Sequence, residues 1–331
     1  MTFYIESRST DPRRNLALEQ FVFDCLDRSR SYCMLWQNDK SVIVGKNQNT
    51  SAEINAAFVN AHNINVIRRL SGAGAVYHDL GNLNFTFISG ADKEGAINFA
   101  EFCRPIQKAL ISFGVPAEIS GRNDMTVDGK KISGNAQYVK NGRVMHHGTL
   151  LYDSDLGTLS KALNVTDDKI ESKGVKSVKS RVANIRPFMK ADMPIKEFWA
   201  ALKKYLFVSF EMEEYTLSAS EEAEVHRLKD QIYSQWSWNF GASPPHNVRK
   251  IRRIEDCGRI EILLDVAKEG VIENAHFFGD FFGTDNSEEL AAMLKGHRLE
   301  YNELAAIIKS VDISRYFFNM DAETFLSLLL E

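Results

Sequence analysis

Two turn dipeptides constrain the fold of this chain more than any other feature. Asp128-Gly129 separates predicted strands at residues 125–127 and 131–139, and Asp-Gly favours the positive dihedral angles of a tight hairpin. Asn141-Gly142 stands in the same way between 131–139 and a further run at 144–151. We therefore predict two successive hairpins between Met125 and Leu151.

Helical patterns surround this hairpin region. A helix at 11–28 opens with the capping pair Asp11-Pro12, and another at 97–113 ends at Gly114 with Pro116 beyond it. A third helical pattern covers 52–62. Strands are predicted at 33–36, 41–44, 66–67, 75–77 and 83–88. The pattern indicates an α/β (α+β) protein in which helices flank a mixed β-sheet.

The chain is long enough for two domains, because hydrophobic cores stop growing near 250 to 300 residues. Helices predicted at 195–210 and 219–233 are the last elements of the first domain. Gly, Ser and two adjacent Pro at 241–245 are typical of a linker and indicate a domain boundary. Strands at 260–267 and 271–278 then precede helices at 287–294, 301–308 and 322–330. We predict domains at 1–245 and 246–331, the second a small α+β module.

Charge and composition exclude several classes of protein. The net charge of −4 does not suggest a nucleic-acid-binding surface. The four cysteines are scattered without metal-binding spacing, which is typical of reduced thiols in a cytosolic protein. Because no signal peptide and no run of about 18 apolar residues occurs, we expect a cytoplasmic protein with no membrane association.

A loop of small residues runs from Arg68 to Asn82 between two predicted strands. Its small side chains, from Ser71 to Gly74, let backbone N–H groups converge on an anion. A neighbouring arginine such as Arg69 would add charge-assisted bonds to phosphate or carboxylate oxygens. A plain tight connection is the alternative, and the spacing fits neither a P-loop nor a dinucleotide fingerprint.

A second candidate segment begins at Gly121 and ends at Ala136. If Lys131 begins a buried strand, Ser133 and Asn135 share its face, so that a cation and two hydrogen-bonding groups line one site. An exposed edge lysine is the alternative.

Two adjacent histidines, His146 and His147, form a third candidate segment. On a strand they point to opposite faces, so one metal ion is not easily bound by both. The chain has none of the usual zinc or calcium motifs.

The segment 169–190 is basic and has little apolar periodicity. It is either a loop that orders around an anion or a plain charged surface loop.

Together these segments resemble the lipoate-protein ligase A family, whose fold is shared with biotin-protein ligases. The matching blocks lie at 68–82, 121–136, 146–151 and 173–184, with weaker similarity at 15–19 and 236–241. The ordered blocks span nearly the whole chain, which makes chance agreement negligible.

The resemblance implies an ATP-dependent enzyme that converts lipoate or octanoate to lipoyl-AMP with release of pyrophosphate. It then transfers the lipoyl group to a lysine of apo lipoyl domains, on 2-oxoacid dehydrogenase E2 subunits and the glycine cleavage H protein. Mg²⁺ is the implied metal, and we expect a monomer. Two anions must be held together during activation, which requires positioned cations and N–H donors.

The family's site residues carry over onto matching positions of this chain. Lys131 is the implied catalytic residue, and Asp124 the implied Mg²⁺ ligand. The implied ATP- and lipoyl-AMP-binding residues are Arg69, Ser71, Gly72, Gly74, Ala75, Val76, Tyr77, His78, Asn82, Asp124, Lys131, Ser133, Gly134, Ala136, His147, Gly148 and Thr149. The implied adenylate-covering loop contains Lys173, Gly174, Ser177, Val178, Ser180 and Arg181.

One residue departs from the family pattern. Ala73 replaces the middle glycine of the family's Gly triplet, and its Cβ resists a positive φ. Either the family backbone tolerates alanine at this position or the pocket is remodelled.

Three rival functions remain open. An ATP-independent acyltransferase of the same fold needs an activated thiol, and Cys103 lies on a predicted apolar helix. Biotin ligation shares the fold and the chemistry. A docking protein that binds lipoyl domains or acyl-adenylate without making the anhydride is the third.

Overall fold

The computed structural model describes residues 2–91, 98–121, 123–164, 182–241, 246–267 and 270–330. The chain forms two compact units. The first contains Met1–Val44, Ser51–Leu70 and Ala75–Asn239, and the second contains Gly45–Thr50, Ser71–Gly74 and Phe240–Glu331. Two short loops from the first quarter of the chain thus group with its C-terminal end. The predicted domain boundary after residue 245 stays a prediction.

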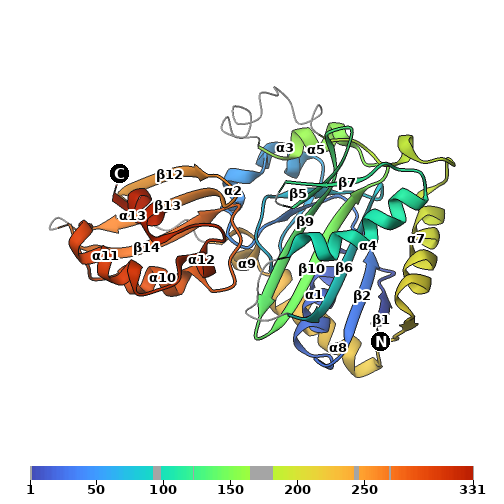
Figure 1. The fold of residues 1–331 in the computed structure, drawn as a ribbon, viewed down its shortest axis with the longest axis horizontal. Helices are drawn as coiled ribbons and strands as arrows, with labels where there is room; N and C mark the ends of the chain where they lie inside the picture. The colour runs from blue at the N-terminus through green and yellow to red at the C-terminus, as the bar shows by residue number, and fades with distance from the viewer. Residues whose placement is uncertain are drawn as a thin grey trace. The chain divides into compact units, whose positions relative to one another are not determined.

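The first unit is built on a mixed sheet with the strand order β11-β1-β2-β6-β10-β9-β8-β7 (Figure 1). β1 pairs in parallel with β2 and β11, and the other neighbours are antiparallel. The strands are β1 (Thr2–Glu6), β2 (Ser31–Trp36), β6 (Asn82–Gly90), β7 (Glu118–Ser120), β8 (Asp124–Val127), β9 (Lys130–Lys140), β10 (Arg143–Leu151) and β11 (Met212–Glu214). The predicted mixed α/β class is confirmed.

Both predicted hairpins are present in this sheet. Asp128 and Gly129, between β8 and β9, have φ angles of 50° and 71°. Asn141 and Gly142, between β9 and β10, have φ angles of 51° and 71°. These positive values are the ones that two-residue hairpin loops require, so the turn chemistry determined this part of the fold.

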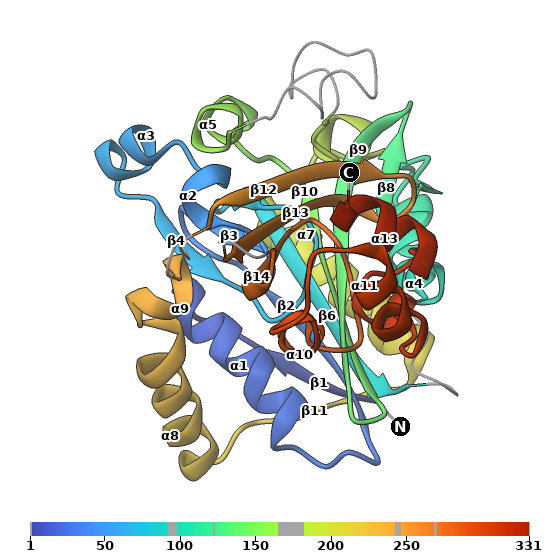
Figure 2. The same cartoon turned by 90° about the vertical axis from the view of Figure 1, so that its left-hand side faces the viewer.

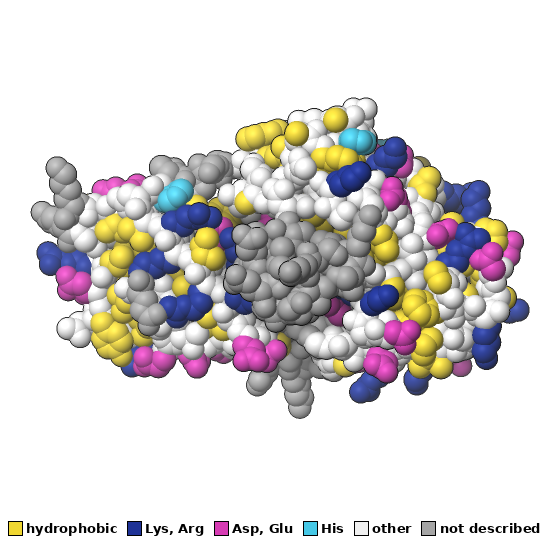
Figure 3. Space-filling model, turned by 90° about the horizontal axis from the view of Figure 1, so that it is seen from above, with side chains coloured by type: hydrophobic (Ala, Val, Ile, Leu, Met, Phe, Trp, Pro, Cys, Tyr) yellow, Lys and Arg dark blue, Asp and Glu magenta, His cyan; other side chains and the backbone are white. Residues whose placement is uncertain are grey.

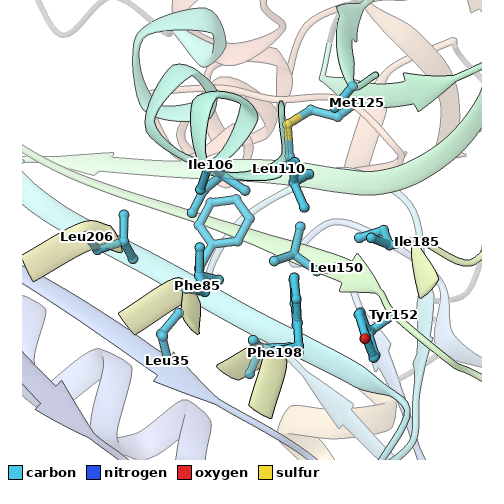
Figure 4. Close-up of a cluster of buried hydrophobic side chains, with 14 of the residues drawn as sticks. Leu35, Phe85, Ile106, Leu110, Met125, Leu150, Tyr152, Ile185, Phe198 and Leu206 are labelled. Atoms are coloured by element: carbon cyan, nitrogen blue, oxygen red, sulfur yellow. The ribbon is translucent and has the colours of Figure 1, made fainter. Parts of the chain in front are cut away.

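Helices cover both faces of the large sheet (Figure 2). α4 (Phe99–Ser112) and α7 (Ile195–Phe210) pack on one face, and the core beneath them includes Phe85, Leu150 and Phe198 (Figure 4). α1 (Pro12–Asp24) and α8 (Ala219–Leu228) pack on the other face. A π-helical turn (Lys229–Tyr233) and α9 (Trp236–Phe240) follow α8. α7 begins and ends at the residues predicted for it, 195 and 210, so that prediction is confirmed.

A smaller sheet in the same unit has the order β4-β3-β5. Its strands are β3 (Ser41–Val44), β4 (Asn65–Arg68) and β5 (Val76–His78), and the short helices of this unit are α2 (Thr50–Glu53), α3 (Ala56–Ala61), α5 (Leu156–Ala162) and η3 (Arg186–Phe188). The single helix predicted at 52–62 is wrong. Asn55 interrupts it by accepting a hydrogen bond from the Phe58 N–H, which caps a new helix.

The C-terminal elements have a core of their own. They are β12 (Val248–Ile254), β13 (Gly258–Val266), β14 (Ile272–Gly279), α10 (Ser287–Leu294), α11 (Tyr301–Lys309), α12 (Ile313–Tyr316) and α13 (Ala322–Leu330). β12 was not predicted, because its apolar residues recur at every third position between pairs of basic residues, which is not the alternation typical of a half-buried strand. The Lys250 Nζ donates to the carbonyl of Leu329 near the end of α13, where a cation is favourable. Figure 3 shows basic side chains gathered over this unit.

Among the residues that the structure describes, no helix is both long and apolar enough to cross a membrane.

Gly81 offers a test of how the turn before β6 is packed. A Cβ there would lie 2.1 Å from the backbone oxygen of Asp153, whereas Gly90 has nothing within 4 Å. Gly81→Ala should therefore lower the free energy of unfolding by about 2 kcal/mol, as overpacking does. Gly90→Ala should leave it nearly unchanged. Denaturant unfolding of both variants measures the difference, and equal stabilities would contradict the tight turn.

Candidate active site

Lys131 and Asp124 form an ion pair at one end of the large sheet. The Lys131 Nζ lies 2.7 Å from the Asp124 Oδ1, and the two side chains are 35% and 25% exposed. The pair is therefore partly shielded but open to a ligand. Its two strands, β8 and β9, are joined by the Asp128-Gly129 hairpin, so local turn chemistry brings the two residues together.

A β-bulge decides which way Lys131 points. Ser133 pairs with Met125 and Lys131 pairs with Thr126, which leaves Ile132 as an extra residue. Ile132 lies in the core with Met125, and Ser133, directly opposite Met125, shares that face. The predicted common face of Lys131, Ser133 and Asn135 is thus wrong. The bulge moves Lys131 to the opposite face, which carries Gly134.

Gly134 leaves the space that the Lys131 side chain occupies. A Cβ at this position would lie 2.8 Å from both the Cε and the Nζ of Lys131. The N–H of Gly134 donates to the Oγ1 of Thr149 at 3.2 Å. The glycine therefore allows the ammonium group to lie close against the strand.

His78 presents a buried hydrogen-bond donor. The Asn38 Oδ1 accepts from Asn15, so the Asn38 Nδ2 donates to the Nδ1 of His78 at 3.1 Å. The proton of the neutral ring is then on Nε2, which is buried without a hydrogen-bond partner among the described residues. Burial, helped by the charges of Arg69 and His147, lowers the pKa of His78 to about 3. His78 is therefore neutral at physiological pH.

Two asparagines add further unpartnered polar atoms. The Asn82 Nδ2 donates to the Asn84 Oδ1 at 2.9 Å. The Asn82 Oδ1 and the Asn84 Nδ2 are buried and have no hydrogen-bond partner in the described part of the chain. Trp36 pairs with Asn84 across β2 and β6, and its ring lies 6.2 Å from that of His78. Buried polar atoms are nearly always satisfied, so this group is suited to a polar ligand.

His147 is held by a carboxylate that the site prediction did not include. Its Nδ1 donates to the Glu19 Oε1 at 3.0 Å, and Thr86 donates to the same oxygen at 2.5 Å. The Trp36 Nε1 donates to Thr86 at 2.9 Å. A glutamate on the apolar face of the predicted first helix was the signal that could have identified Glu19.

The remaining predicted residues of the first unit divide between the two faces. Ala136 lies opposite His147 in the sheet. A Cβ at Gly148 would meet Asn135 and Phe85, and Ser133 accepts a hydrogen bond from Asn135. The Ser133 side chain therefore lies on the α4 side of the sheet, and a side chain at position 148 would point to that side too. Ser133 and Gly148 could contact a ligand on the other face only through backbone atoms.

Arg69 and Tyr77 are both buried. The Arg69 Nη1 donates to the carbonyl of Ile43 at 3.0 Å, and burial lowers its pKa to about 10, which leaves it charged at neutral pH. Burial raises the pKa of Tyr77 to about 12. Ala75 and Val76 are half-buried.

The small-residue loop Ser71–Gly74 belongs to the second unit. A Cβ at Gly72 would lie 2.3 Å from the carbonyl oxygen of Phe281, and the Ala73 N–H donates to that oxygen at 3.4 Å. Ala73 has a φ of 68°, a value that an alanine adopts at a cost of about 1 kcal/mol. Alanine therefore keeps the left-handed conformation that glycine favours.

The predicted adenylate loop, with Lys173, Gly174, Ser177, Val178, Ser180 and Arg181, lies outside the described residues.

Cys103 lacks the surroundings of a nucleophile. It is 1% exposed, and burial raises its pKa to about 12. Its Sγ lies 3.8 Å from the Nε2 of His146, a ring that also contacts Asn135 and Gln137. His146 and His147 thus face opposite sides of the sheet as predicted, and the thiol lies on the side away from Glu19 and His147.

The lowered pKa of His78 predicts an acid-sensitive stability. In the unfolded chain His78 binds a proton as the pH falls below its usual pKa of 6.5. In the folded protein its pKa is about 3, so it binds a proton only near pH 3. Stability present above pH 6.5 is therefore lost as the pH falls, by about 1.4 kcal/mol per pH unit. Between pH 6 and pH 4.5 the free energy of unfolding should depend less steeply on pH in His78→Gln than in the wild type. His62→Gln, at an exposed position, is the control, and parallel slopes for all three proteins would refute the assignment.

Comparisons with known proteins identify the family of this chain. Residues 11–207 match the lipoyl protein ligase A/B catalytic domain, and residues 243–329 match the bacterial lipoate protein ligase C-terminus. The chain is 43% identical over 332 residues to lipoate-protein ligase LplJ of Bacillus subtilis (strain 168), covering 99% of this chain and 100% of that protein.

Two solved structures have a similar fold. One comes from a structural analysis of the bipartite lipoate protein ligase and its E2 lipoyl domain from Thermoplasma acidophilum, with 29% identity, a TM-score of 0.62 and coverage of 75% of this chain and 99% of that one. The other is a lipoate-protein ligase A bound with ATP, with 26% identity, a TM-score of 0.61 and coverage of 72% and 98%. The chain belongs to the lipoyl protein ligase A/B family.

Proposed function

We propose that this chain is an ATP-dependent lipoate-protein ligase in which Lys131 is the catalytic cation. The observation that carries the proposal is the Lys131 ammonium, held 2.7 Å from Asp124 in the space that Gly134 leaves. It lies on the same face of the sheet as the unpartnered polar atoms of Asn82 and Asn84. A positioned cation and unsatisfied polar groups on one face of the sheet are suited to binding two anionic substrates that must react with each other.

In the first step a lipoate or octanoate carboxylate oxygen attacks the α-phosphorus of ATP. A new acyl–phosphate bond forms, the bond to the β-phosphate breaks, and pyrophosphate leaves. Negative charge accumulates around the phosphorus, and a positioned cation stabilises that charge better than water does. We assign this role to Lys131, with Arg69 as a further donor.

In the second step the lysine amine of an acceptor domain attacks the acyl carbon of lipoyl-AMP. An amide forms, the amine loses a proton and AMP leaves. Lys131 would again neutralise charge, now on the departing phosphate. The buried Nε2–H of His78 is suited to orienting an oxygen atom of the intermediate.

The proposed Mg²⁺ fits the donors that are present. Within the described ranges, no three His, Cys, Asp or Glu side chains gather closely enough to hold a metal ion. Mg²⁺ commonly takes one carboxylate and completes its shell with phosphate oxygens and water, and Asp124 would be that carboxylate. The ion would reduce the repulsion between the two anionic substrates.

The remaining assignments complete the proposal. The acceptors are apo lipoyl domains of 2-oxoacid dehydrogenase E2 subunits and the glycine cleavage H protein, and the ligase acts as a cytoplasmic monomer. The segment with Lys173, Gly174, Ser177, Val178, Ser180 and Arg181 would cover the adenylate. The buried, high-pKa thiol of Cys103 argues against a thioester route.

Lipoylation of an apo lipoyl domain tests the function. Wild-type protein incubated with lipoate, Mg²⁺ and ATP should add one lipoyl group to the domain, as measured by mass spectrometry. Lys131→Ala should slow this reaction about 100-fold or more, as expected for loss of a charge-stabilising donor. Lys130→Ala, an exposed neighbour, is the control. Transfer that needs no ATP and stops in Cys103→Ala would instead support the thioester route.

Gly134→Ala tests how Lys131 is positioned. The new methyl group should displace the flexible end of Lys131, so adenylation should slow about tenfold or more while the melting temperature changes little. Adenylation is measured as lipoate-dependent exchange of labelled pyrophosphate into ATP. In a Lys131→Ala background the same substitution should cause no further loss, because both changes act through one ammonium group. Additive losses would mean that Gly134 acts in another way.

A further inference from the structure

A second cleft lies on the first unit, outside the groups assigned to the chemistry. It has a volume of about 470 Å³ and is lined by residues that follow or end β1, by the start of α7 and by Gln37. The residues that matter here are Glu6, Arg8, Gln37, Lys196, Trp199 and Lys203. We call this the β1–α7 cleft.

The β1–α7 cleft is positively charged on a protein whose net charge is −4. Its walls carry three cations, Arg8, Lys196 and Lys203, against the carboxylate of Glu6. A second carboxylate, that of Glu214 beyond the wall, interacts electrostatically with Arg8 and Lys203, so the net positive charge comes mainly from Lys196. Only Lys203 has ion pairs among the described residues, at 3.1 Å from Glu6 and 2.8 Å from Glu214. Arg8 and Lys196 are exposed. A local patch opposite in sign to the whole protein attracts an anionic partner.

The position of Lys196 strengthens this field. It lies in the first turn of α7, where no side chain caps the helix. A cation is electrostatically unfavourable at the positive end of a helix. The adjacent Glu197 complements the helix end, and the exposed Lys196 ammonium stays available to an anionic partner in the cleft.

Buried hydrogen bonds connect the cleft wall to the candidate active site. Ser7, in the wall, donates to the Asn15 Oδ1 at 2.6 Å, and the Asn15 Nδ2 donates to the Asn38 Oδ1 at 2.9 Å. Asn38 in turn holds His78. The Gln37 Nε2 donates to the carbonyl of Leu80 at 3.0 Å. The cleft is thus held at a set position relative to His78.

We infer that the β1–α7 cleft docks carboxylate side chains of the acceptor domain, close to the lysine that receives the acyl group. This inference rests on the proposed function, because only the second half-reaction involves a protein substrate. The cations lie at the surface, where a domain can reach them. Trp199 in the wall and the half-exposed Leu80 nearby supply the apolar contacts that protein interfaces add to charge.

The test separates docking from adenylation. Arg8→Glu and Lys196→Glu should each raise the KM for an apo E2 lipoyl domain about tenfold, with kcat nearly unchanged. Pyrophosphate exchange and acyl transfer to hydroxylamine, which needs no docking, should keep wild-type rates. Lys204→Glu, an exposed position on α7 outside the cleft, makes the same charge change and should leave the KM unaltered. The wild-type KM should also rise with salt, more steeply than that of the cleft variants.

Two results would overturn the inference. One is a KM for the lipoyl domain that changes no more in Lys196→Glu than in Lys204→Glu. The other is a rise in the KM for ATP in the exchange reaction, which would make the cleft a nucleotide site. Failure of the proposed function would look different, since the wild-type protein itself would then show neither exchange nor lipoylation.

Discussion

The candidate site depends on one extra residue in β9. Without the bulge at Ile132, strict alternation would place Lys131 beside Ser133, on the face buried under α4. With the bulge, Ile132 fills the core and Lys131 joins Gly134 and Asp124 on the other face. The backbone next to the bulge is secured from outside the hairpin, because the Lys131 carbonyl accepts from the Ala183 N–H at 2.9 Å. A bulge re-aims a side chain without adding a loop.

Side chains of α1 form hydrogen bonds that hold the polar groups on the Lys131 face of the sheet in position. Asn15 and Glu19 are four residues apart, so they lie on the same side of the helix, and both are almost fully buried. Glu19 holds His147 directly, and Asn15 holds His78 through Asn38. Buried polar side chains on a helix are costly unless they are satisfied. This arrangement satisfies them and orients two imidazole rings at the same time.

The opposite face of the sheet separates this enzyme from the rival of the same fold. His146, adjacent to His147, points toward α4 and stacks against Phe102 with ring centroids 5.2 Å apart. Cys103 lies beside it, buried and protonated. The pleat of one strand thus places neighbouring histidines on different faces, one in the core and one on the face of the candidate site. A thiol on the core side is badly placed to carry an acyl group.

Turn and capping chemistry determined much of this protein from the sequence by itself. The two hairpins and the start of α1 depend on turn and cap residues close together in the chain, and the ordered motif blocks identified the family. Tertiary structure alone decided the pairing of β1 with β11 and the basic strand β12. It also decided the bulge at Ile132 and the partner of Glu19. These features depend on contacts between distant segments, and local propensity or periodicity carries no information about which distant partner a residue will meet.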